Sequence, residues 1–407
     1  MLTSIDLFCG AGGFTEGFKQ AGFRCLYGND IDPNAIETFR LNHPQAWADS
    51  RQIEKVDPGN VRRKLGLRRG ELSVITGGPP CQGFSINAPD RFLEDPRNAL
   101  FKHYIRFIDE FKPLAFVFEN VPGILSLADG HIYERVQNEL KKHGYQLSSR
   151  ILFAAHYGVP QERWRLIIMG SRKGLAPAVP EPTHFASGRA NFKGGKTHTI
   201  QLLPFDRLAL LPHVTVSEAL ADLPELEMGE GGEVVAYGDI SPSNYAKSLR
   251  NGNIETYNHY AAKLAPQNRE RLKYIKPGGS WRDIPFHLLP KGMKRARKSD
   301  HTKRYGRLRG DGLSATIMTK CDPHWGPVFL PSQDRALTVR EAARLQSFPD
   351  NYRFVGPRVS QYEQVGNAVP VLMAKAIAKA IARHLEGKRE EPTNWRSESL
   401  SFSATAR

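Results

Sequence analysis

The chain has 407 residues, of which 40% are hydrophobic and 24% are charged, a composition that is typical of a folded globular protein and argues against wholesale disorder. No segment approaches 18 uninterrupted apolar residues, and the N-terminus lacks the basic and apolar regions of a secretion signal, so neither a membrane span nor export is expected. The formal net charge of +15 favours a polyanionic partner.

Residues 3 to about 170 predict alternating strands and helices, the pattern of an α/β domain with a mostly parallel, doubly wound sheet. Five apolar runs are typical of strands, namely 3–8, 23–30, 71–78, 113–120 and 164–171. Apolar residues at helical spacing predict a helix over 99–111. Because ligands bind at the carboxyl ends of parallel strands, the polar residues that follow these runs form the candidate site.

The pattern changes after about Ser171, where the sequence becomes irregular and basic up to about residue 320, with 259–275 as the best helix candidate. Helical patterns return after Thr338, which has capping-box spacing to Glu341, and over 370–385. We therefore expect a catalytic and cofactor-binding domain over 1–172 and a smaller irregular domain with a hinge over 173–335. The chain then returns to the first domain over 336–387 and ends in a mobile tail over 388–407.

Basic residues gather in two places. The stretch from His287 to Arg309 holds nine Lys or Arg and a single acid, and a second cluster spans Val61 to Gly70. Most single runs of charge are solvated surface, but two clusters on a basic chain favour binding to nucleic acid.

A glycine turn follows the first predicted strand, in IDLFCGAGGFTEGF. Glycines allow a ligand to approach the backbone, and Asp30, about twenty residues after Gly10, stands where an acid can bind ribose hydroxyls. These features fit NAD, FAD or S-adenosylmethionine, although a lone glycine turn is weak evidence. Thr15 replaces a third fingerprint glycine and no cation flanks the turn, which disfavours a dinucleotide.

Cys81 differs in its surroundings from the other three cysteines, Cys9, Cys25 and Cys321. None has zinc-site spacing, so we expect reduced thiols, an intracellular protein and no metal. In GGPPCQGFS, two prolines fix the backbone before Cys81 at a strand end, as a nucleophile requires. The segment after it has the composition of a mobile active-site loop.

Two further strand ends carry charged residues. Glu119 ends the apolar run PLAFVF, where it could cap a turn or donate a proton. In QERWR, Gln161, Arg163 and Arg165 alternate, so a strand would direct all three to one face. Two arginines aimed together favour a functional role.

Taken in order, DLFCGAGGF, GGPPCQGFS, FENV, QERWR, LTVREAARLQSFPD and QVGNAVP resemble the motifs of the DNA (cytosine-5)-methyltransferases of the bacterial, restriction-modification or Dcm-like type. The resemblance covers about residues 3–170 and 305–385, and the irregular basic stretch falls where that family has its target-recognition domain. It implies a Rossmann-like methyltransferase domain, S-adenosylmethionine as methyl donor with S-adenosylhomocysteine as product, and cytosine in double-stranded DNA as acceptor.

The resemblance implies that Cys81 adds as a thiolate to carbon 6 of a flipped-out cytosine and so activates carbon 5. It assigns Glu119 to the ring nitrogen and exocyclic amine, Arg165 to the cytosine carbonyl oxygen, and Arg163 and Gln161 to the support of the site. Enzymes that methylate exocyclic amines typically carry an aromatic residue after Pro-Pro, so PPC favours carbon as the target atom.

The resemblance also implies residues for the cofactor and for DNA. Those for S-adenosylmethionine are Phe8, Gly10, Gly12, Gly13, Asp30, Ile31, Asp49, Ser50, Pro80, Leu100, Asn367 and Ala368. Those for DNA are Gln82, Ser85, Lys291, Arg295, Arg297, Lys303 and Arg304. At Ile31 the sequence departs from members that place an aromatic residue against adenine.

Three alternatives differ in substrate or class. The branch of the family that methylates tRNA carries a Cys-Phe-Thr segment, whereas the downstream cysteine here is Cys321 in KCDPHWG. A catalytically silent DNA-binding paralogue leaves the set of Cys81, Glu119 and Arg165 unexplained, and a nicotinamide oxidoreductase leaves PPCQ and QERWR without a role. We expect a cytoplasmic, nucleoid-associated monomer, with a restriction endonuclease as a separate partner where one exists.

Overall fold

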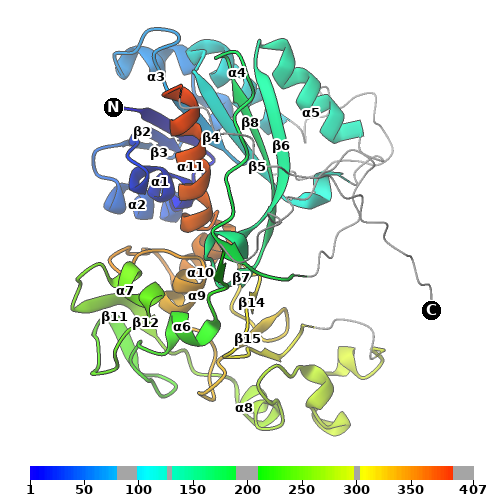
Figure 1. Ribbon diagram of the computed structural model, residues 1–407. Helices are drawn as coiled ribbons and strands as arrows, with labels where there is room; N and C mark the ends of the chain where they lie inside the picture. The colour runs from blue at the N-terminus through cyan, green and yellow to red at the C-terminus, as the bar shows by residue number, and fades with distance from the viewer. Residues whose placement is uncertain (80–98, 126–130, 189–209, 298–302, 388–407) are drawn as a thin grey trace.

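The computed structural model describes residues 1–79, 99–125, 131–188, 210–297 and 303–387 (Figure 1). The strands are β1 Thr3–Leu7, β2 Arg24–Asn29, β3 Trp47–Asp49, β4 Val74–Gly77, β5 Ala115–Asn120, β6 Gln146–Phe153, β7 Gln161–Glu162, β8 Trp164–Ser171, β9 His184–Phe185, β10 Leu211–Pro212, β11 Gly231–Ala236, β12 Glu255–Tyr260, β13 Gly306–Arg307, β14 Ser314–Ala315 and β15 Pro327–Phe329. The helices are α1 Gly13–Gln20, α2 Pro33–Asn42, α3 Pro58–Lys64, α4 Ala99–Phe111, α5 His131–Lys142, α6 Val216–Leu220, α7 Asn244–Arg250, α8 Pro266–Leu272, α9 Val339–Leu345, α10 Arg358–Asn367 and α11 Val371–Leu385.

A seven-stranded sheet in the order β3-β2-β1-β4-β5-β8-β6 forms the centre of the molecule. β1 pairs in parallel with β2 and β4, and β4 pairs in parallel with β5, whereas β8 runs antiparallel to both β5 and β6. The strand order reverses between β1 and β4, and ligands of such sheets bind at the carboxyl ends beside this switch point. The predicted α/β fold with a mostly parallel sheet is confirmed.

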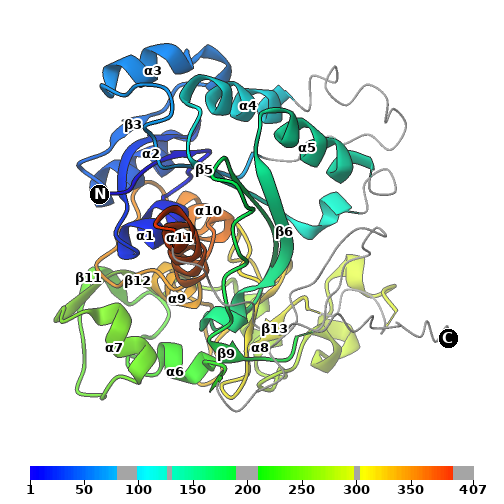
Figure 2. The same ribbon diagram turned by 45° about the horizontal axis from the view of Figure 1, so that its top comes forward.

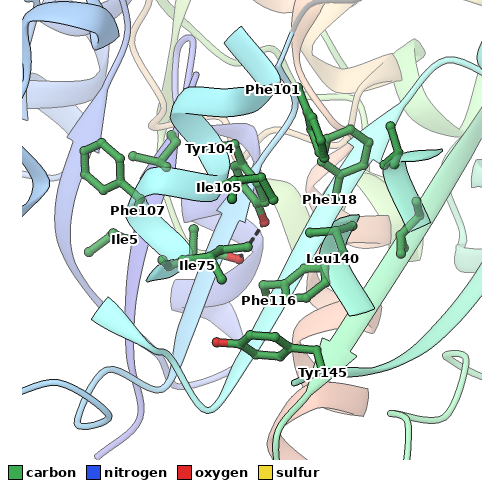
Figure 3. Close-up of a cluster of buried hydrophobic side chains, with 14 of the residues drawn as sticks. Ile5, Ile75, Phe101, Tyr104, Ile105, Phe107, Phe116, Phe118, Leu140 and Tyr145 are labelled. Atoms are coloured by element: carbon green, nitrogen blue, oxygen red, sulfur yellow. Dashed lines mark hydrogen bonds between the residues drawn. The ribbon is translucent and has the colours of Figure 1, made fainter. Parts of the chain in front are cut away.

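Helices cover both faces of the sheet because apolar strand residues alternate between them. In β5, Phe116 and Phe118 join the cluster of α4 and α5, whereas Ala115 and Val117 join that of α1 and α11. Figure 2 shows α1 and α11 on one side of the sheet and α4 and α5 on the other. In Figure 3, Tyr104 of α4 lies among aromatic and branched side chains, and its hydroxyl donates to the backbone oxygens of Ile75 (3.4 Å) and Val117 (3.1 Å).

Several predicted elements have the expected bounds, and the differences have physical causes. α4 spans the predicted 99–111, and α9 begins after Thr338 with both halves of its capping box formed. α8 occupies only part of the predicted 259–275, because β12 takes the preceding residues and pairs with β11. β3 and β6 were not predicted from the sequence. They are the two edge strands of the sheet, and their half-buried residues give a weak apolar pattern.

The segment from residue 210 to 330 forms a smaller body below the sheet in Figure 1. It joins the rest through β14, which pairs in parallel with β7, and through a buried ion cluster. In that cluster Arg344 of α9 donates to Asp350 (2.9 Å), to Asp222 and to the backbone oxygen of Ala219 (2.9 Å). Because a buried charge is costly without partners, these bonds fix the smaller body to α9.

α10 and α11 lie in one segment, Arg358–Leu385, which is long and apolar enough to cross a membrane by length and composition alone. Of its most apolar window, 67% is buried inside the protein. The apolar positions predicted for one face of the last helix, Met373, Ile377, Ile381 and Leu385, all pack in the cluster shared with α1. The segment is therefore buried in the way that a core helix of a folded protein is buried.

Candidate active site

A cavity of about 680 Å³ opens at the carboxyl ends of β1, β2, β4 and β5, beside the switch point of the sheet. The C-terminal end of α10 closes one side of it. Eight of the residues predicted for the cofactor line this cavity: Phe8, Gly10, Gly13, Asp30, Ile31, Leu100, Asn367 and Ala368. Segments that are far apart in the sequence thus line the same cavity.

The turn after β1 has the backbone of a ligand-binding loop. Phe8 adopts a left-handed conformation with φ 57°, and Gly10 one with φ 52°. A non-glycine residue in this region is strained, and such strain collects at functional sites. A Cβ on Gly10 would have no atom within 4 Å, so its backbone faces open space. The turn therefore exposes backbone to whatever fills the cavity.

Asp30 is held rigidly at the end of β2. Its carboxylate accepts hydrogen bonds from the backbone nitrogens of Gly10 (2.8 Å) and Asp32 (3.0 Å). Burial raises the pKa of this carboxyl above its usual value, and the two backbone hydrogen bonds partly offset that effect. Each oxygen keeps a further lone pair, so Asp30 can accept from hydroxyl groups of a ligand.

Ile31 presents an apolar surface to the same cavity. Its side chain is 63% exposed, although large apolar residues of this protein are otherwise mostly buried. Ile53, which follows β3, also lines the cavity. An exposed aliphatic side chain beside an acid that can bind hydroxyls fits a ligand with a flat ring attached to a sugar.

Three other predicted cofactor residues do not line the cavity. Gly12 packs instead against His43 and Tyr352. The carboxylate of Asp49 is occupied by Arg51 (2.7 Å) and by the hydroxyl of Tyr27 (2.9 Å), and Ser50 is exposed beyond it. Their assignment to the cofactor remains a prediction.

Glu119 and Arg165 form an ion pair within the cavity lining. Glu119 is the last residue but one of β5 and Arg165 is the second residue of β8. The antiparallel pairing of these strands brings their side chains together, with 2.7 Å between Nε of Arg165 and Oε1 of Glu119. A Cβ on Gly78 would lie 2.7 Å from Oε2 of Glu119, so a larger residue there would displace the carboxylate. A carboxylate and a guanidinium are thus fixed together beside the predicted cofactor site.

Arg163 and Gln161 connect this strand to the C-terminal segment. Arg163 is 1% exposed and donates to the backbone oxygens of Gly366 (2.9 Å) and Ala368 (3.0 Å) at the end of α10. Gln161 accepts from the nitrogen of Ile317 (3.0 Å) and donates to the oxygen of Leu345 (2.9 Å). Arg163 also lines the cavity, between the Glu119–Arg165 ion pair and the residues at the end of α10 that are predicted to bind the cofactor.

The predicted nucleophile cannot be placed in the same way. Cys81, together with Pro80, Gln82 and Ser85, lies outside the described residues. Two positions earlier, Pro79 lines the cavity, and its backbone oxygen accepts a hydrogen bond from the amide nitrogen of Asn120 (3.2 Å). Pro79, the last described residue before Cys81, thus belongs to the cavity lining.

Comparison with known proteins decides the family. Residues 2–383 match the family described as C-5 cytosine-specific DNA methylase. The chain belongs to this family. It is 35% identical to the type II methyltransferase M.AgeI of Thalassovita gelatinovora over 93% of this chain and 99% of that protein. It is 30% identical to DNA (cytosine-5)-methyltransferase 1 of Mus musculus over 93% of this chain, but over 28% of that longer protein.

Solved structures agree with the fold. A putative DNA modification methyltransferase encoded within a prophage of E. coli has a TM-score of 0.71 at 24% identity, covering 95% of this chain and 100% of that one. DNMT2 of Spodoptera frugiperda has a TM-score of 0.57 at 17% identity over 94% of this chain and 100% of that one. The protein is thus a DNA (cytosine-5)-methyltransferase, and membership of this family implies double-stranded DNA as its substrate.

The five described residues that were predicted to bind DNA lie on the smaller body of the methylase. Lys291, Arg295 and Arg297 are exposed there. Lys303 forms an ion pair with Glu162 (3.1 Å), which lies between Gln161 and Arg163. Arg304 lies over the ring of Trp325, 5.4 Å from its centroid, and that indole is 54% exposed. Cations and an exposed aromatic ring thus lie beside the strand that carries the site arginines.

The other basic cluster, over Val61–Gly70, lies elsewhere. It precedes β4, so it belongs to the amino edge of the sheet, whereas the cavity opens at the carboxyl edge. All four of its arginines are in ion pairs, Arg62 and Arg69 with Glu110, Arg63 with Asp57 (3.9 Å), and Arg68 with Glu71. The expectation that the two clusters bind nucleic acid remains a prediction for both of them.

Sequence reasoning missed several cavity residues of the methylase. They are Cys9, Phe14, Asn29, Asp32, Ala35, Ile53, Glu54, Gly78, Pro79, Asn120, Val121, Glu363, Gln364, Gly366 and Val369. Most adjoin a predicted residue or fall inside a recognised motif, so proximity in sequence could have found them. Ile53 and Glu54 had no such signal. In the described part of the chain, no group of three or more His, Cys, Asp or Glu could hold a metal ion.

Proposed function

We propose that this methylase transfers a methyl group from S-adenosylmethionine to carbon 5 of a flipped-out cytosine in a specific double-stranded DNA sequence, through a covalent adduct of Cys81. The observation that carries the proposal is the Glu119–Arg165 ion pair, fixed at 2.7 Å in the lining of a cavity that the glycine turn and Asp30 also line. A tRNA cytosine or a silent DNA-binding paralogue remains the alternative.

The residues of the cavity fit S-adenosylmethionine, which supplies the methyl group when it is bound. Asp30 would accept hydrogen bonds from the ribose hydroxyls, and Ile31 would pack against the adenine ring. The Phe8–Gly13 turn together with Asn367 and Ala368 would enclose the methionine end. An exposed apolar side chain next to a partly satisfied carboxylate suits this amphipathic ligand better than a purely polar one.

The chemistry requires a nucleophile because carbon 5 of cytosine is too electron-poor to be methylated directly. The Cys81 thiolate forms a bond to carbon 6, and Glu119 gives a proton to the ring nitrogen as negative charge builds there. Arg165 binds the carbonyl oxygen and stabilises the same charge. Carbon 5 takes the methyl group, and S-adenosylhomocysteine is left as the product. Solvent water takes the carbon-5 proton, the ring-nitrogen proton returns to Glu119, and the bond between Cys81 and carbon 6 breaks to restore the thiolate.

In the free protein Arg165 donates to Glu119, so the pair holds both side chains in position before the base arrives. Arg163, which donates to the end of α10, keeps the strand aligned with the cofactor side. A cytosine inside a duplex is out of reach of these groups, so it must be flipped out, at a cost of about a few kcal/mol. Lys291, Arg295, Arg297, Lys303 and Arg304 would neutralise backbone phosphates, and the family resemblance assigns Gln82 and Ser85 to DNA as well.

The division into domains at 172, 335 and 387 remains part of the proposal. Residues 1–172 and 336–387 would bind the cofactor and carry out the chemistry, and 173–335 would recognise the target. We also propose a cytoplasmic monomer, with a restriction endonuclease as a separately acting partner.

Bisulfite sequencing of DNA from cells that express the chain tests the proposal, because it reports activity, target atom and target sequence together. We expect protected cytosines in one short sequence context. Cys81→Ser should abolish methylation, whereas Cys321→Ser, a partly buried thiol outside the cavity lining, should retain it. Methylation by Cys81→Ser at the wild-type rate would contradict the mechanism.

A duplex that carries 5-fluorocytosine within the identified sequence then tests the covalent step. Fluorine cannot leave carbon 5 as a proton does, so the adduct should persist and survive denaturing electrophoresis. The Cys81→Ser variant is the control and should give no adduct. An active wild-type enzyme that forms no adduct on this duplex would rule out attack by Cys81.

A further inference from the structure

A buried tyrosine and a buried histidine lie behind the glycine turn, away from the catalytic groups. Tyr352 is 2% exposed, and its hydroxyl donates to the backbone oxygen of Ala11, in the middle of the turn. His43, 6% exposed, follows the end of α2, and its Nε2 lies 3.0 Å from that hydroxyl oxygen. Neither side chain lines the cavity.

The pair is packed directly on Gly12. This glycine has φ 93°, and a Cβ on it would lie 2.7 Å from the Tyr352 oxygen and 3.0 Å from Nε2 of His43. The neighbouring glycines, Gly10 and Gly13, line the cavity. One side of the turn therefore faces the ligand space while Tyr352 and His43 occupy the other.

The hydrogen bonds have a defined direction. The Tyr352 hydroxyl donates its hydrogen to Ala11, so it accepts one from Nε2 of His43. Burial lowers the pKa of His43 to about 3, and a hydrogen bond with the Gly12 backbone offsets part of this. The imidazole is thus neutral at physiological pH and keeps the hydrogen on Nε2 that this bond needs.

Tyr352 itself is fixed to α2 by the residues that follow it. Asn42 and Arg353 exchange two hydrogen bonds, of 2.9 and 3.1 Å, and the nitrogen of Val355 donates to Thr38 (2.9 Å). The hydroxyl of Thr38 donates in turn to Gln364 (2.6 Å), which lines the cavity. These bonds leave the tyrosine ring little freedom to withdraw from the turn.

We propose that Tyr352 and His43 are positioning residues for the cofactor, holding the Gly10–Gly13 backbone in the shape that accepts S-adenosylmethionine. The inference rests on the proposed function, since it assumes that this cavity binds that ligand. Neither residue touches the reacting atoms, so their removal should weaken cofactor binding and leave the chemical step unchanged once the cofactor is bound.

Tyr352→Phe removes the hydroxyl and keeps the ring, so it is the test variant. We expect its Kd for S-adenosylhomocysteine, measured by calorimetry, to rise about 3- to 10-fold, the effect of losing the one hydrogen bond of this hydroxyl that reaches the turn, to Ala11. Its KM for S-adenosylmethionine should rise in parallel, with kcat at saturating cofactor within about 2-fold of wild type. His43→Gln, which retains a donor, should bind more tightly than His43→Phe.

Tyr245→Phe is the matched control. Tyr245 is also buried and its hydroxyl donates to a backbone oxygen, that of Arg344, but it lies outside the cavity lining. This variant should lose a similar amount of thermal stability with an unchanged Kd. Equal Kd values for Tyr352→Phe and wild type, or equal weakening in both tyrosine variants, would overturn the inference. A wild-type protein that binds no S-adenosylhomocysteine would instead remove the proposed function.

Discussion

Asp6 of β1 carries a buried carboxyl group. It lies two residues before Phe8, which lines the cavity. It is 1% exposed, and its two oxygens accept from the hydroxyls of Thr15 (2.8 Å) and Thr76 (2.8 Å). Burial raises its pKa to about 6, which the two hydroxyl donors counteract in part. The folded state therefore holds this proton at pH values where the unfolded chain, with a value of 3.8, has lost it.

The sign of the resulting pH dependence follows from that difference. The contribution of Asp6 to the free energy of unfolding is fully present below about pH 4 and is lost as the pH rises through about 6. Asp6→Asn should remove this dependence. The variant should gain about 1 kcal/mol relative to wild type between about pH 5 and about pH 7.5, as measured by urea unfolding.

Wild type is the reference at each pH, so the opposite contribution of His43, whose pKa is lowered to about 3, cancels in the comparison. A constant offset between the two proteins at both pH values would mean that ionisation of Asp6 does not contribute.

At this scale the sequence motifs located the cavity well. Phe8, Asp30 and Ile31 could be chosen because each adjoins the end of a strand that was itself predictable. Gly12 could not be assigned its packing partner, because Tyr352 is 340 positions away and nothing local connects them. Asp49 was assigned to the cofactor although its partner, Arg51, stands two residues later in the chain.

Among the elements, α1 and α11 pack unusually closely. A Cβ on Gly17 of α1 would lie 2.5 Å from the Cβ of Ala374 and 2.7 Å from the backbone nitrogen of Lys375. Backbone cannot move aside as a flexible side chain can. Glycine is thus required here for the approach of the helices, and not for the conformation of the backbone.

Gly17→Ala should force the helices apart and lower the free energy of unfolding by about 1–3 kcal/mol, the cost of overpacking a core. Alanine's better helix propensity would return at most about 1 kcal/mol. The matched control is Gly59→Ala in α3, where a Cβ meets only side-chain ends at 3.3 Å or more. Urea unfolding should show a loss for Gly17→Ala alone, and equal stability of both variants would contradict close packing.

Helices and central strands were predictable because their burial imposes a pattern. α4 and α11 carry apolar residues at helical spacing, β4 and β5 are mostly apolar, and β1 is buried over nearly its whole length. The order of the strands was not predictable, nor was the antiparallel β8 that brings Arg165 beside Glu119. Those features depend on how the sheet assembles, which no single segment encodes.

Across the whole molecule, the cations of the chain separate into two surfaces with different surroundings. Those near Val61 are paired with Glu110 and Glu71, whereas Lys303 is paired with Glu162 of β7, next to the strand that carries Arg165. Glu110 stands more than forty positions from the cluster with which it pairs, so this pairing could not be predicted from the sequence.

Replacing Lys303 and Arg304 together by alanine should weaken DNA binding and reduce the slope of log affinity against log salt by about 2, since each phosphate that is no longer neutralised changes it by about 0.9. Arg68→Ala with Arg69→Ala removes the same charge at the opposite edge and serves as the control. Fluorescence anisotropy over a range of salt measures both slopes. A reduced slope in the control pair alone would place the DNA on the other surface.

The packing of α1 against α11 also has a consequence for synthesis of the protein. Gly10 emerges from the ribosome long before Asn367 of the cavity and the helix that packs behind α1. A nascent chain therefore cannot complete its cofactor site until α11 has been synthesised. Chains that terminate before α11 should be inert in methylation.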